Sequence, residues 1–461
     1  MKGLPSCAAL LLGSALTAQT PAYTHEISFD FFPQLDLLND TTALVCGGHL
    51  QGIEFSQRAV CIHAAASGAT NAWVYNEDDV ATGFTTDVLA LSDGNVLLYT
   101  PEDVSLVGAN LELHLTKLDP QGNLLWNVDH PIALTSLVYQ SRFRVFETSD
   151  NRIVVLAPLQ GENGVDYELR FYDLDGNFLS NVPVDLDVSG DSVYDQGNSY
   201  MTSDDQWLLA GRHVSNNFLL SMAMDGSINW NTEYTADPDP DLWYTDLCQR
   251  ANGDILVCGY YSDDGNQGVV QRFDAQGNYQ DELVLGNVPD VVITRCVREL
   301  SDGRVAVGMR WMGDNQVWSP RLIVFSEDLT IEEVAYTWPT DVTGTVENLR
   351  ETSDGQLVGI NDMILGSAER TDLWRFTLQP LVSVGEWTVE RLRIGPNPAV
   401  DRLVVHGVDQ AVCVVYGMNG QRLLEGASGP SGIEIAHLPK GTYLLEVHGP
   451  QGPVRMRWVK A

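Results

Sequence analysis

Short apolar runs separated by tight polar turns follow one another through residues 24–385 of this 461-residue chain. The clearest unit begins at Arg250 and reads RANGDILVCGYYSDDGNQGVVQRFDAQGNYQDE. Its Ala-Asn-Gly turn and its later Asp-x-x-Gly-Asn turn each join two apolar runs, and Gly and Asn tolerate the positive φ that tight hairpin turns require. The pattern predicts four short strands per unit and no long amphipathic helix.

The first of these turns, which begins Ser-Asp in five of the seven units and reads Ser-Asp-Gly in three, recurs about every fifty residues. The second turn residue in the seven units is Asp40, Asp93, Asp150, Asp204, Asn252, Asp302 and Asp354. Seven four-stranded units predict an all-β fold, a seven-bladed β-propeller over residues 19–380. The apolar run after each turn, such as residues 255–257, is expected to be the inner strand. The seventh unit lacks a second Asp-Gly turn, so we expect residues 24–30 to supply its outer strand and remove an open edge.

The units resemble the delta-60 family of propeller-like repeats, which share the turn, the apolar run, a glycine and the later Asp-Gly. They differ from the Asp-box of sialidases, because no unit has the Ser-x-Asp-x-Gly-x-Thr-Trp spacing. We also find no tryptophan-docking pattern of the kind expected in quinoprotein propellers. A helical solenoid and an array of separate sandwich domains do not fit this period.

The last part of the chain has a different pattern. RIGPNPAVDRLVVHG from Arg393, VVYGMNGQRLLEG from Val414 and IEIAHLPKGTYLLEVHG from Ile433 alternate apolar runs with Asn-Gly and Lys-Gly turns. This pattern predicts a compact β-sandwich over residues 386–461, after a linker at 381–385. The motif residues are Pro396, Asn397, Pro398, Asp401, Gly420, Gly441 and Tyr443.

These motifs, in this order, resemble the type A C-terminal sorting domain of the type IX secretion system of Gram-negative bacteria. The resemblance implies export by that secretion machinery and cleavage by a surface sortase, often with attachment to lipopolysaccharide. One departure is Gly395, where an aromatic residue commonly precedes Pro-Asn-Pro. We therefore expect a secreted protein, either extracellular or attached to the outer cell surface.

The amino terminus agrees with export. Lys2, an apolar segment over residues 8–16 and the small residue Ala18 predict a signal peptide of residues 1–18. No other apolar run approaches the roughly 20 residues of a membrane span. An exported protein can hold disulfides. Cys248 and Cys258 flank one turn symmetrically, and Cys46 and Cys61 flank another, so each pair could be a bridge or two small buried hydrophobic residues.

Composition limits the partners. The chain has 26 Lys plus Arg against 62 Asp plus Glu, a formal net charge of −36, which repels nucleic acid and keeps an exported protein soluble and monomeric. No zinc-type Cys/His spacing, phosphate loop, dinucleotide fingerprint or nucleophile elbow is present. The acidic run at residues 237–241 lacks the glycine and glutamate of a calcium loop. We therefore assign no catalytic residue, cofactor or metal.

The loops after the second strand and between units should share one mouth of the ring, and here they are rich in aromatic residues. The candidate ligand-binding residues are Trp243, Tyr244, Tyr260, Trp311 and Trp318. Rings beside carboxylates suit sugar binding, although aromatic residues could equally cap the blade ends. The sequence favours a non-enzymatic module that binds a glycan, a protein or a matrix component. The alternative is an extracellular polysaccharide hydrolase or lyase.

Overall fold

The computed structural model describes residues 23–27, 31–51, 54–65, 68–77, 87–103, 111–132, 144–160, 165–184, 193–213, 216–234, 242–262, 266–286, 290–312, 317–329, 332–337, 343–365, 368–378, 393–395, 399–406, 412–417, 421–427, 432–449 and 452–460. The predicted signal peptide lies outside these residues. The chain divides into two compact units, residues 1–378 and 379–461. Every element in the described ranges is a β-strand, so the all-β class is confirmed. The described residues contain no helix that is long and apolar enough to cross a membrane.

In the first unit, the described residues form seven four-stranded antiparallel sheets, numbered here in chain order. Sheets 1 to 3 contain β2 (Phe31–Asn39), β3 (Thr42–Gln51), β4 (Glu54–Ala65) and β5 (Gly68–Glu77); β6 (Asp87–Ala90), β7 (Val96–Asp103), β8 (Leu111–Leu118) and β9 (Leu124–Ile132); and β10 (Val145–Glu147), β11 (Ile153–Gln160), β12 (Val165–Tyr172) and β13 (Phe178–Val184). Sheets 4 and 5 contain β14 (Val193–Met201), β15 (Trp207–His213), β16 (Asn216–Met222) and β17 (Ile228–Tyr234); and β18 (Leu242–Gln249), β19 (Ile255–Tyr261), β20 (Gln267–Phe273) and β21 (Tyr279–Leu285). Sheets 6 and 7 contain β22 (Val291–Glu299), β23 (Val305–Met312), β24 (Trp318–Phe325) and β25 (Glu332–Thr337); and β26 (Thr343–Glu351), β27 (Gln356–Leu365), β28 (Ala368–Thr377) and β1 (Tyr23–Ile27).

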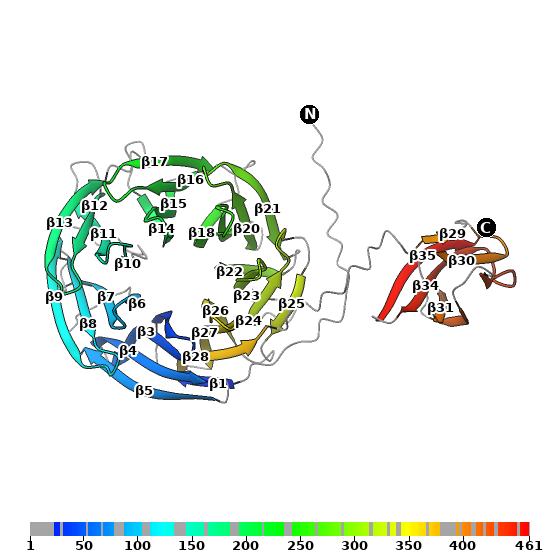
Figure 1. Ribbon diagram of the computed structural model, residues 1–461, viewed down its shortest axis with the longest axis horizontal. Coiled ribbons are helices and arrows are strands. Elements are labelled where there is room, and N and C mark those ends of the chain that lie inside the picture. Colours follow the sequence, from blue (N-terminus) through cyan, green and yellow to red (C-terminus); the bar gives the residue numbers. More distant parts are fainter. Residues whose placement is uncertain are drawn as a thin grey trace. The chain divides into compact units, whose positions relative to one another are not determined.

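The seven sheets follow one another around a ring, with the first strand of each toward the centre (Figure 1). The first strand of sheet 7, β26, contacts the first strand of sheet 1, β2. The apolar run after each turn is therefore the second strand of its sheet, and our assignment of it as the inner strand was wrong. The run is nearly all apolar because a second strand is covered on both faces by neighbouring sheets, as in β19, where residues 255–259 are buried.

The N-terminal strand pairs with the last repeat, as the sequence predicted. β1 runs antiparallel to β28, with Tyr23 opposite Arg375 and Ile27 opposite Thr371. Ile27 is buried and belongs to a core cluster that includes Leu373 of β28. The strand covers backbone groups of β28 that would otherwise form an open edge.

Two kinds of turn lie at one edge of the ring, here called the turn edge. Turns of the Ser-Asp-Gly type join the first two strands of each sheet, and in sheets 2, 3 and 5 an Asp-x-x-Gly-Asn turn joins the last two. Several Ser-Asp-Gly serines donate their backbone N–H and hydroxyl to a carboxylate of the next sheet. These serine–carboxylate contacts are Ser92 with Glu147, Ser149 with Asp205, Ser301 with Glu351, and Ser353 with Asp40. The last of them joins sheet 7 to sheet 1.

Outer-strand tryptophans make a second contact between sheets at the turn edge. Trp73 of β5 donates its Nε1–H to the Pro120 carbonyl of sheet 2 at 3.0 Å, and Trp126 of β9 donates to the Leu174 carbonyl of sheet 3 at 3.1 Å. Gly122 is the turn glycine of sheet 2, and a Cβ on it would lie 2.6 Å from the Trp73 ring. The outer-strand rings thus pack on the glycine turn of the following sheet, a contact between sheets that the sequence analysis did not anticipate.

All six described cysteines are buried free thiols, so the suggested bridges are absent. The strand register explains this result: Cys248 lies opposite Leu256, and Cys258 lies opposite Asp246. The hairpin pairs Gln249 with Ile255, so its axis passes through Asn252 and leaves Cys258 two residues beyond the partner of Cys248. In sheet 1, Cys61 lies opposite Leu44. The alternative reading, that these are small buried hydrophobic side chains, describes the structure.

The second unit contains two small antiparallel sheets. One is formed by β29 (Arg393–Gly395), β30 (Arg402–His406) and β33 (Ile433–Glu434), and the other by β31 (Val412–Gly417), β32 (Arg422–Ala427), β34 (Gly441–Gly449) and β35 (Gly452–Lys460). One buried cluster combines Leu403 and Val405 of the first sheet with Val415 and Leu445 of the second. The unit therefore has a core of its own.

Candidate functional site

The predicted aromatic residues lie at the edge of the ring opposite the turn edge, here called the rim. Trp243 is near the start of β18 and lies opposite Tyr260, near the end of β19. Trp311 is near the end of β23, and Trp318 begins β24. These four side chains are intermediate in exposure. They occupy one end of sheets 5 and 6, where a ligand can reach them.

Tyr244 does not belong to this surface. Its side chain is buried, and its hydroxyl donates to Oε1 of Gln271 at 2.7 Å. Burial raises the pKa of the Tyr244 phenol well above its usual range. Successive strand residues point to opposite faces, and Tyr244 therefore points away from its exposed neighbour Trp243. Our assignment of Tyr244 as a ligand-binding residue was wrong.

Each of the three rim tryptophans has an arginine over its ring. The guanidinium carbon lies 4.7 Å from the ring centroid for Arg212 over Trp243, 4.5 Å for Arg310 over Trp318, and 4.1 Å for Arg321 over Trp311. Such cation–π contacts hold the guanidinium flat against the ring. The arginines were not among the predicted site residues. A pattern of aromatic residues alone could not show them, because Arg212 and Trp243 come from different sheets.

The three arginine–tryptophan pairs occupy three successive gaps between sheets. Arg212 of sheet 4 covers Trp243 of sheet 5, so this pair lies in the gap between sheets 4 and 5. In sheet 6, Trp311 and Arg321 share one face while Arg310 and Trp318 share the other, because side chains alternate along a strand. Gly308 lies on the same face as Arg310, and a Cβ there would meet Val346 of sheet 7. The Arg310–Trp318 pair therefore lies between sheets 6 and 7, and the Arg321–Trp311 pair lies between sheets 5 and 6. The rim is therefore an extended row rather than one convergent pocket.

Two arginines at the rim, Arg295 and Arg310, interact through their charges. Burial, followed by the charge of Arg295, lowers the pKa of Arg310, while Glu347, Tyr260 and Asp362 oppose this effect. Nε of Arg295 lies 3.7 Å from a carboxylate oxygen of Glu347. Arg310 therefore lies near a second cation, Arg295, and near the Tyr260 phenol. The row offers flat apolar rings and strong hydrogen-bond donors to the same ligand.

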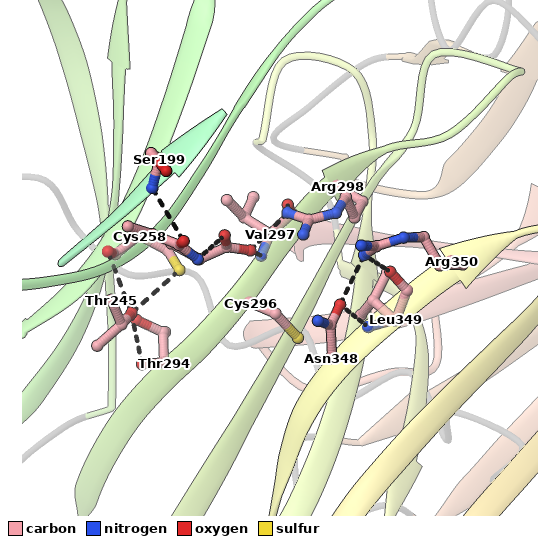
Figure 2. Close-up of polar contacts among 12 residues, drawn as sticks. Ser199, Thr245, Cys258, Thr294, Cys296, Val297, Arg298, Asn348, Leu349 and Arg350 are labelled. Atoms are coloured by element: carbon pink, nitrogen blue, oxygen red, sulfur yellow. Dashed lines mark hydrogen bonds and ion pairs between the residues drawn. The ribbon is translucent and has the colours of Figure 1, made fainter. Parts of the chain in front are cut away.

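A second polar group, which the sequence reasoning missed, lies at the centre of the ring. It appears when the repeats are aligned on the Ser-Asp-Gly turn. The residue six positions before the marker is Gln34, Asp87, Arg144, Asn198, Asp246, Cys296 and Asn348 in the seven units. Most of these are polar, in or next to otherwise apolar first strands, and that was the available signal. Figure 2 shows two members of this group, Cys296 and Asn348, together with Arg298 and Arg350, which lie two positions further along the same strands.

The residues of the C-terminal motif are only partly described. Pro396, Asn397, Pro398 and Gly420 lie outside the described residues. Asp401 is exposed, and its backbone carbonyl accepts the N–H of Ile435 at 2.8 Å. Gly441 begins β34 opposite Lys460, and buried Tyr443 donates its hydroxyl to the Pro439 carbonyl at 2.6 Å. In the described part, the motif residues hold turns and strand ends in place.

No protein-family model and no curated protein matches the chain. Among solved structures, a protein of unknown function from Dyadobacter fermentans is 12% identical, with a TM-score of 0.43 over 64% of this chain and 94% of that one. Sqt1 from Chaetomium thermophilum is 9% identical, with a TM-score of 0.43 over 78% and 99%. The polysaccharide lyase Uly1 is 9% identical, with a TM-score of 0.46 over 76% and 90%. Similarity this low has no bearing on function.

Proposed function

We propose that residues 19–380 form a seven-bladed β-propeller that acts as a non-enzymatic binding module. The observation that supports this most directly is the row of three arginine–tryptophan pairs at the rim of sheets 4, 5 and 6. Each ring is intermediate in exposure, and each lies at its own gap between sheets. A row of separate contacts suits an extended ligand bound along the rim. Catalysis would instead need reactive groups that converge on one bond.

The chemistry of the row favours a glycan. The face of a sugar ring carries C–H groups that pack on indole and phenol rings, and its hydroxyl groups accept hydrogen bonds from guanidinium. Trp243 and Tyr260 are cross-strand neighbours and together offer a wider flat surface than one ring alone. A protein or matrix component with similar groups would use the same contacts.

We also propose that the chain is exported by the type IX secretion system. The signal-peptide pattern of residues 1–18, the ordered motifs of residues 386–461 and a second unit with its own core support this assignment. The second unit would then be the sorting β-sandwich, recognised by the secretion machinery and cleaved by a surface sortase. A fusion of residues 386–461 to a reporter with a signal peptide should appear outside the cell. Retention of the reporter in the periplasm would contradict the assignment.

Binding is tested by a glycan array combined with a reducing-end assay on the glycans that bind. We expect retention of glycan without new reducing ends, and weaker binding by Trp311→Ala and Trp243→Ala. Tyr279→Ala is the matched control, because Tyr279 is 39% exposed but follows a turn at the opposite edge. New reducing ends would favour a hydrolase or lyase. If all three variants bind glycan as tightly as the wild type, the rim is not the binding site.

A further inference from the structure

The centre of the ring gathers buried and half-buried charges from several sheets. Asp36, Asp87 and Asp246 provide carboxylates, while Arg144, Arg298 and Arg350 provide guanidinium groups. All six lie in or next to the first strands, which surround the centre in Figure 1. The cluster stands apart from the rim described above.

The carboxylates of this cluster are fully used by the ring itself. Asp246 accepts from Nδ2 of Asn198 at 2.6 Å, from the Val297 N–H at 3.1 Å and from Arg298. Asp87 accepts the N–H groups of Val88 at 3.0 Å and Val145 at 3.2 Å. In each case the carboxylate joins its own sheet to the next one. These groups therefore have a structural role between neighbouring sheets.

Asp36 has the same role at the other side of the cluster. It accepts the Ala90 N–H at 2.8 Å, which joins sheet 1 to sheet 2. Its second oxygen lies 3.3 Å from Nε of Arg350 in sheet 7. All three carboxylates thus have partners within the ring, and most of those partners are groups other than arginine.

The arginines, in contrast, have donors to spare. A guanidinium has five N–H groups. Arg298 uses only Nη1, toward Asp246 and the Val297 carbonyl, and Arg350 uses Nε and Nη1, toward Asp36, Asn348 and the Leu349 carbonyl (Figure 2). Within the described ranges, Nη2 of Arg298 and Nη2 of Arg350 meet no hydrogen-bond acceptor. Among the described residues, Arg144 donates through Nε alone, to Asn198 at 2.8 Å.

These spare donors belong to like charges that act on one another. Burial, followed by the charge of Arg298, lowers the pKa of Arg350; the charge of Arg144 adds to the effect, while Asp36 and Asp246 oppose it. The pKa of Arg298 itself is raised, because the effect of burial is outweighed by charges that include that of Asp246. The side chains of Arg298 and Arg350 are only 16% and 22% exposed, so water screens them poorly while a small solute can still reach them. An anion on the guanidinium edges would supply acceptors to the Nη2 donors that have none among the described residues.

We propose that the centre of the ring binds a small oxyanion, a carboxylate, sulfate or phosphate group, on the guanidinium edges of Arg298 and Arg350, with Arg144 contributing a third positive charge. The guanidinium fork matches the two oxygens of such a group. The chain has a formal net charge of −36, which repels large polyanions. A small anion is therefore the better ligand for this site. This site goes beyond the proposed rim function and does not depend on it.

The test is isothermal titration calorimetry of the folded chain with sodium acetate, sodium sulfate and sodium phosphate, at an ionic strength held constant with sodium chloride. We expect saturable heat with at least one of the three anions. Arg350→Gln and Arg298→Gln should each weaken that binding by about tenfold or more, since each removes charged donors. Arg321→Gln, at the rim, is the matched control and should bind the anion like the wild type.

Absence of saturable heat with all three anions would overturn the proposal, as would equal affinity in the wild type and both glutamine variants. Removal of Arg298 leaves the Asp246 charge without its partner, and that variant could fail to fold. The double variant Arg298→Lys with Arg350→Lys keeps both charges but loses the fork, and an unchanged affinity there would also overturn the site. Loss of glycan binding in rim variants leaves this outcome unaffected, which separates the two proposals.

Discussion

The two edges of the ring use the same repeat in different ways. At the turn edge, one contact recurs from sheet to sheet: a turn serine bonded to a carboxylate of the next sheet, as in Ser92 with Glu147 and Ser353 with Asp40. At the rim, the arginine–tryptophan pairs of the described residues occur only around sheets 4, 5 and 6. A contact that repeats with the sheets serves assembly of the ring. A contact that breaks the repetition is the better candidate for function.

The largest expected effect tests how strongly assembly depends on the first strand. Deletion of residues 19–30 removes β1, exposes the edge of β28 and uncovers part of the core around Ile27. We expect the free energy of unfolding to fall by about 3 to 6 kcal/mol, from the lost apolar burial and the unpaired backbone groups. Urea denaturation followed by circular dichroism measures the change.

The control for this deletion is Glu26→Gln in the same strand. The Glu26 side chain is 63% exposed and lies 3.1 Å from Arg370, so its loss should change stability by less than about 1 kcal/mol. If the deletion behaves like this substitution, β1 is dispensable and the turn-edge contacts alone hold the ring together.

The next effect separates tryptophan docking from turn geometry. Gly277 has φ +77°, and a Cβ there would lie 2.4 Å from the Trp230 ring, so Gly277→Ala should cost about 2 to 4 kcal/mol in backbone strain and overpacking. Gly94 has φ +83° but no heavy atom within 4 Å of its Cβ position, so Gly94→Ala should cost only the strain, about 1 to 2 kcal/mol. Thermal unfolding of both variants measures the difference. Equal losses would show that the docked ring yields easily.

The turn edge was largely predictable from the sequence, because turn chemistry is local. The glycine and aspartate of each turn set the hairpin within a few residues, and the spacing of the turns then defined the sheets. The pairing of β1 followed from the missing turn in the last repeat. Docking of Trp73 and Trp126 was not predicted, because each ring meets a turn almost fifty residues further on. That contact depends on how far one sheet is rotated against the next.

The rim and the centre were less predictable, for a different reason. Position near a predicted loop identified Trp243 and Trp311 correctly. Tyr244 is buried, because it follows Trp243 in the strand and points to the opposite face. Arg212 reaches Trp243 from another sheet, so only packing brings that pair together, whereas Arg310 and Arg321 reach their tryptophans within the β23–β24 hairpin. At the centre, Asp246 and Arg298 are far apart in sequence and belong to neighbouring sheets. Repeat alignment shows a row of polar residues at the centre, but it does not show that Arg298 and Arg350, two positions further along, have donors to spare.

A smaller effect concerns the pH dependence of the turn edge. The hydrogen bonds from the Ser353 hydroxyl and backbone N–H lower the pKa of Asp40 below its usual 3.8. A lowered pKa in the folded state means that the contact stabilises above pH 3.8 and that this contribution is lost as the pH falls through the folded-state pKa of Asp40. Asp40→Asn should therefore lower the melting temperature at pH 7, and the difference from the wild type should vanish in strong acid.

Ser353→Ala in the Asp40→Asn background serves as the control for this contact. Because the aspartate is already gone, the second substitution should change the melting temperature little at any pH, as a double-mutant cycle requires. A wild type and an Asp40→Asn variant that differ equally at pH 7 and at pH 2 would show that the Asp40 charge has no part in joining sheet 7 to sheet 1.

The smallest expected change in stability lies at the rim, and it sharpens the comparison most. Arg212→Gln and Arg321→Gln each remove one cation–π contact on a half-exposed ring, worth about 0.5 to 1 kcal/mol. If the rim serves ligand binding, the double variant should unfold near the wild-type midpoint while its glycan affinity falls by tenfold or more, about 1.4 kcal/mol. Denaturation and glycan titration of the same preparation give both values. A large loss of stability with unchanged glycan affinity would show that the rim pairs serve packing between sheets. The two edges would then differ only in which side chains hold the ring together.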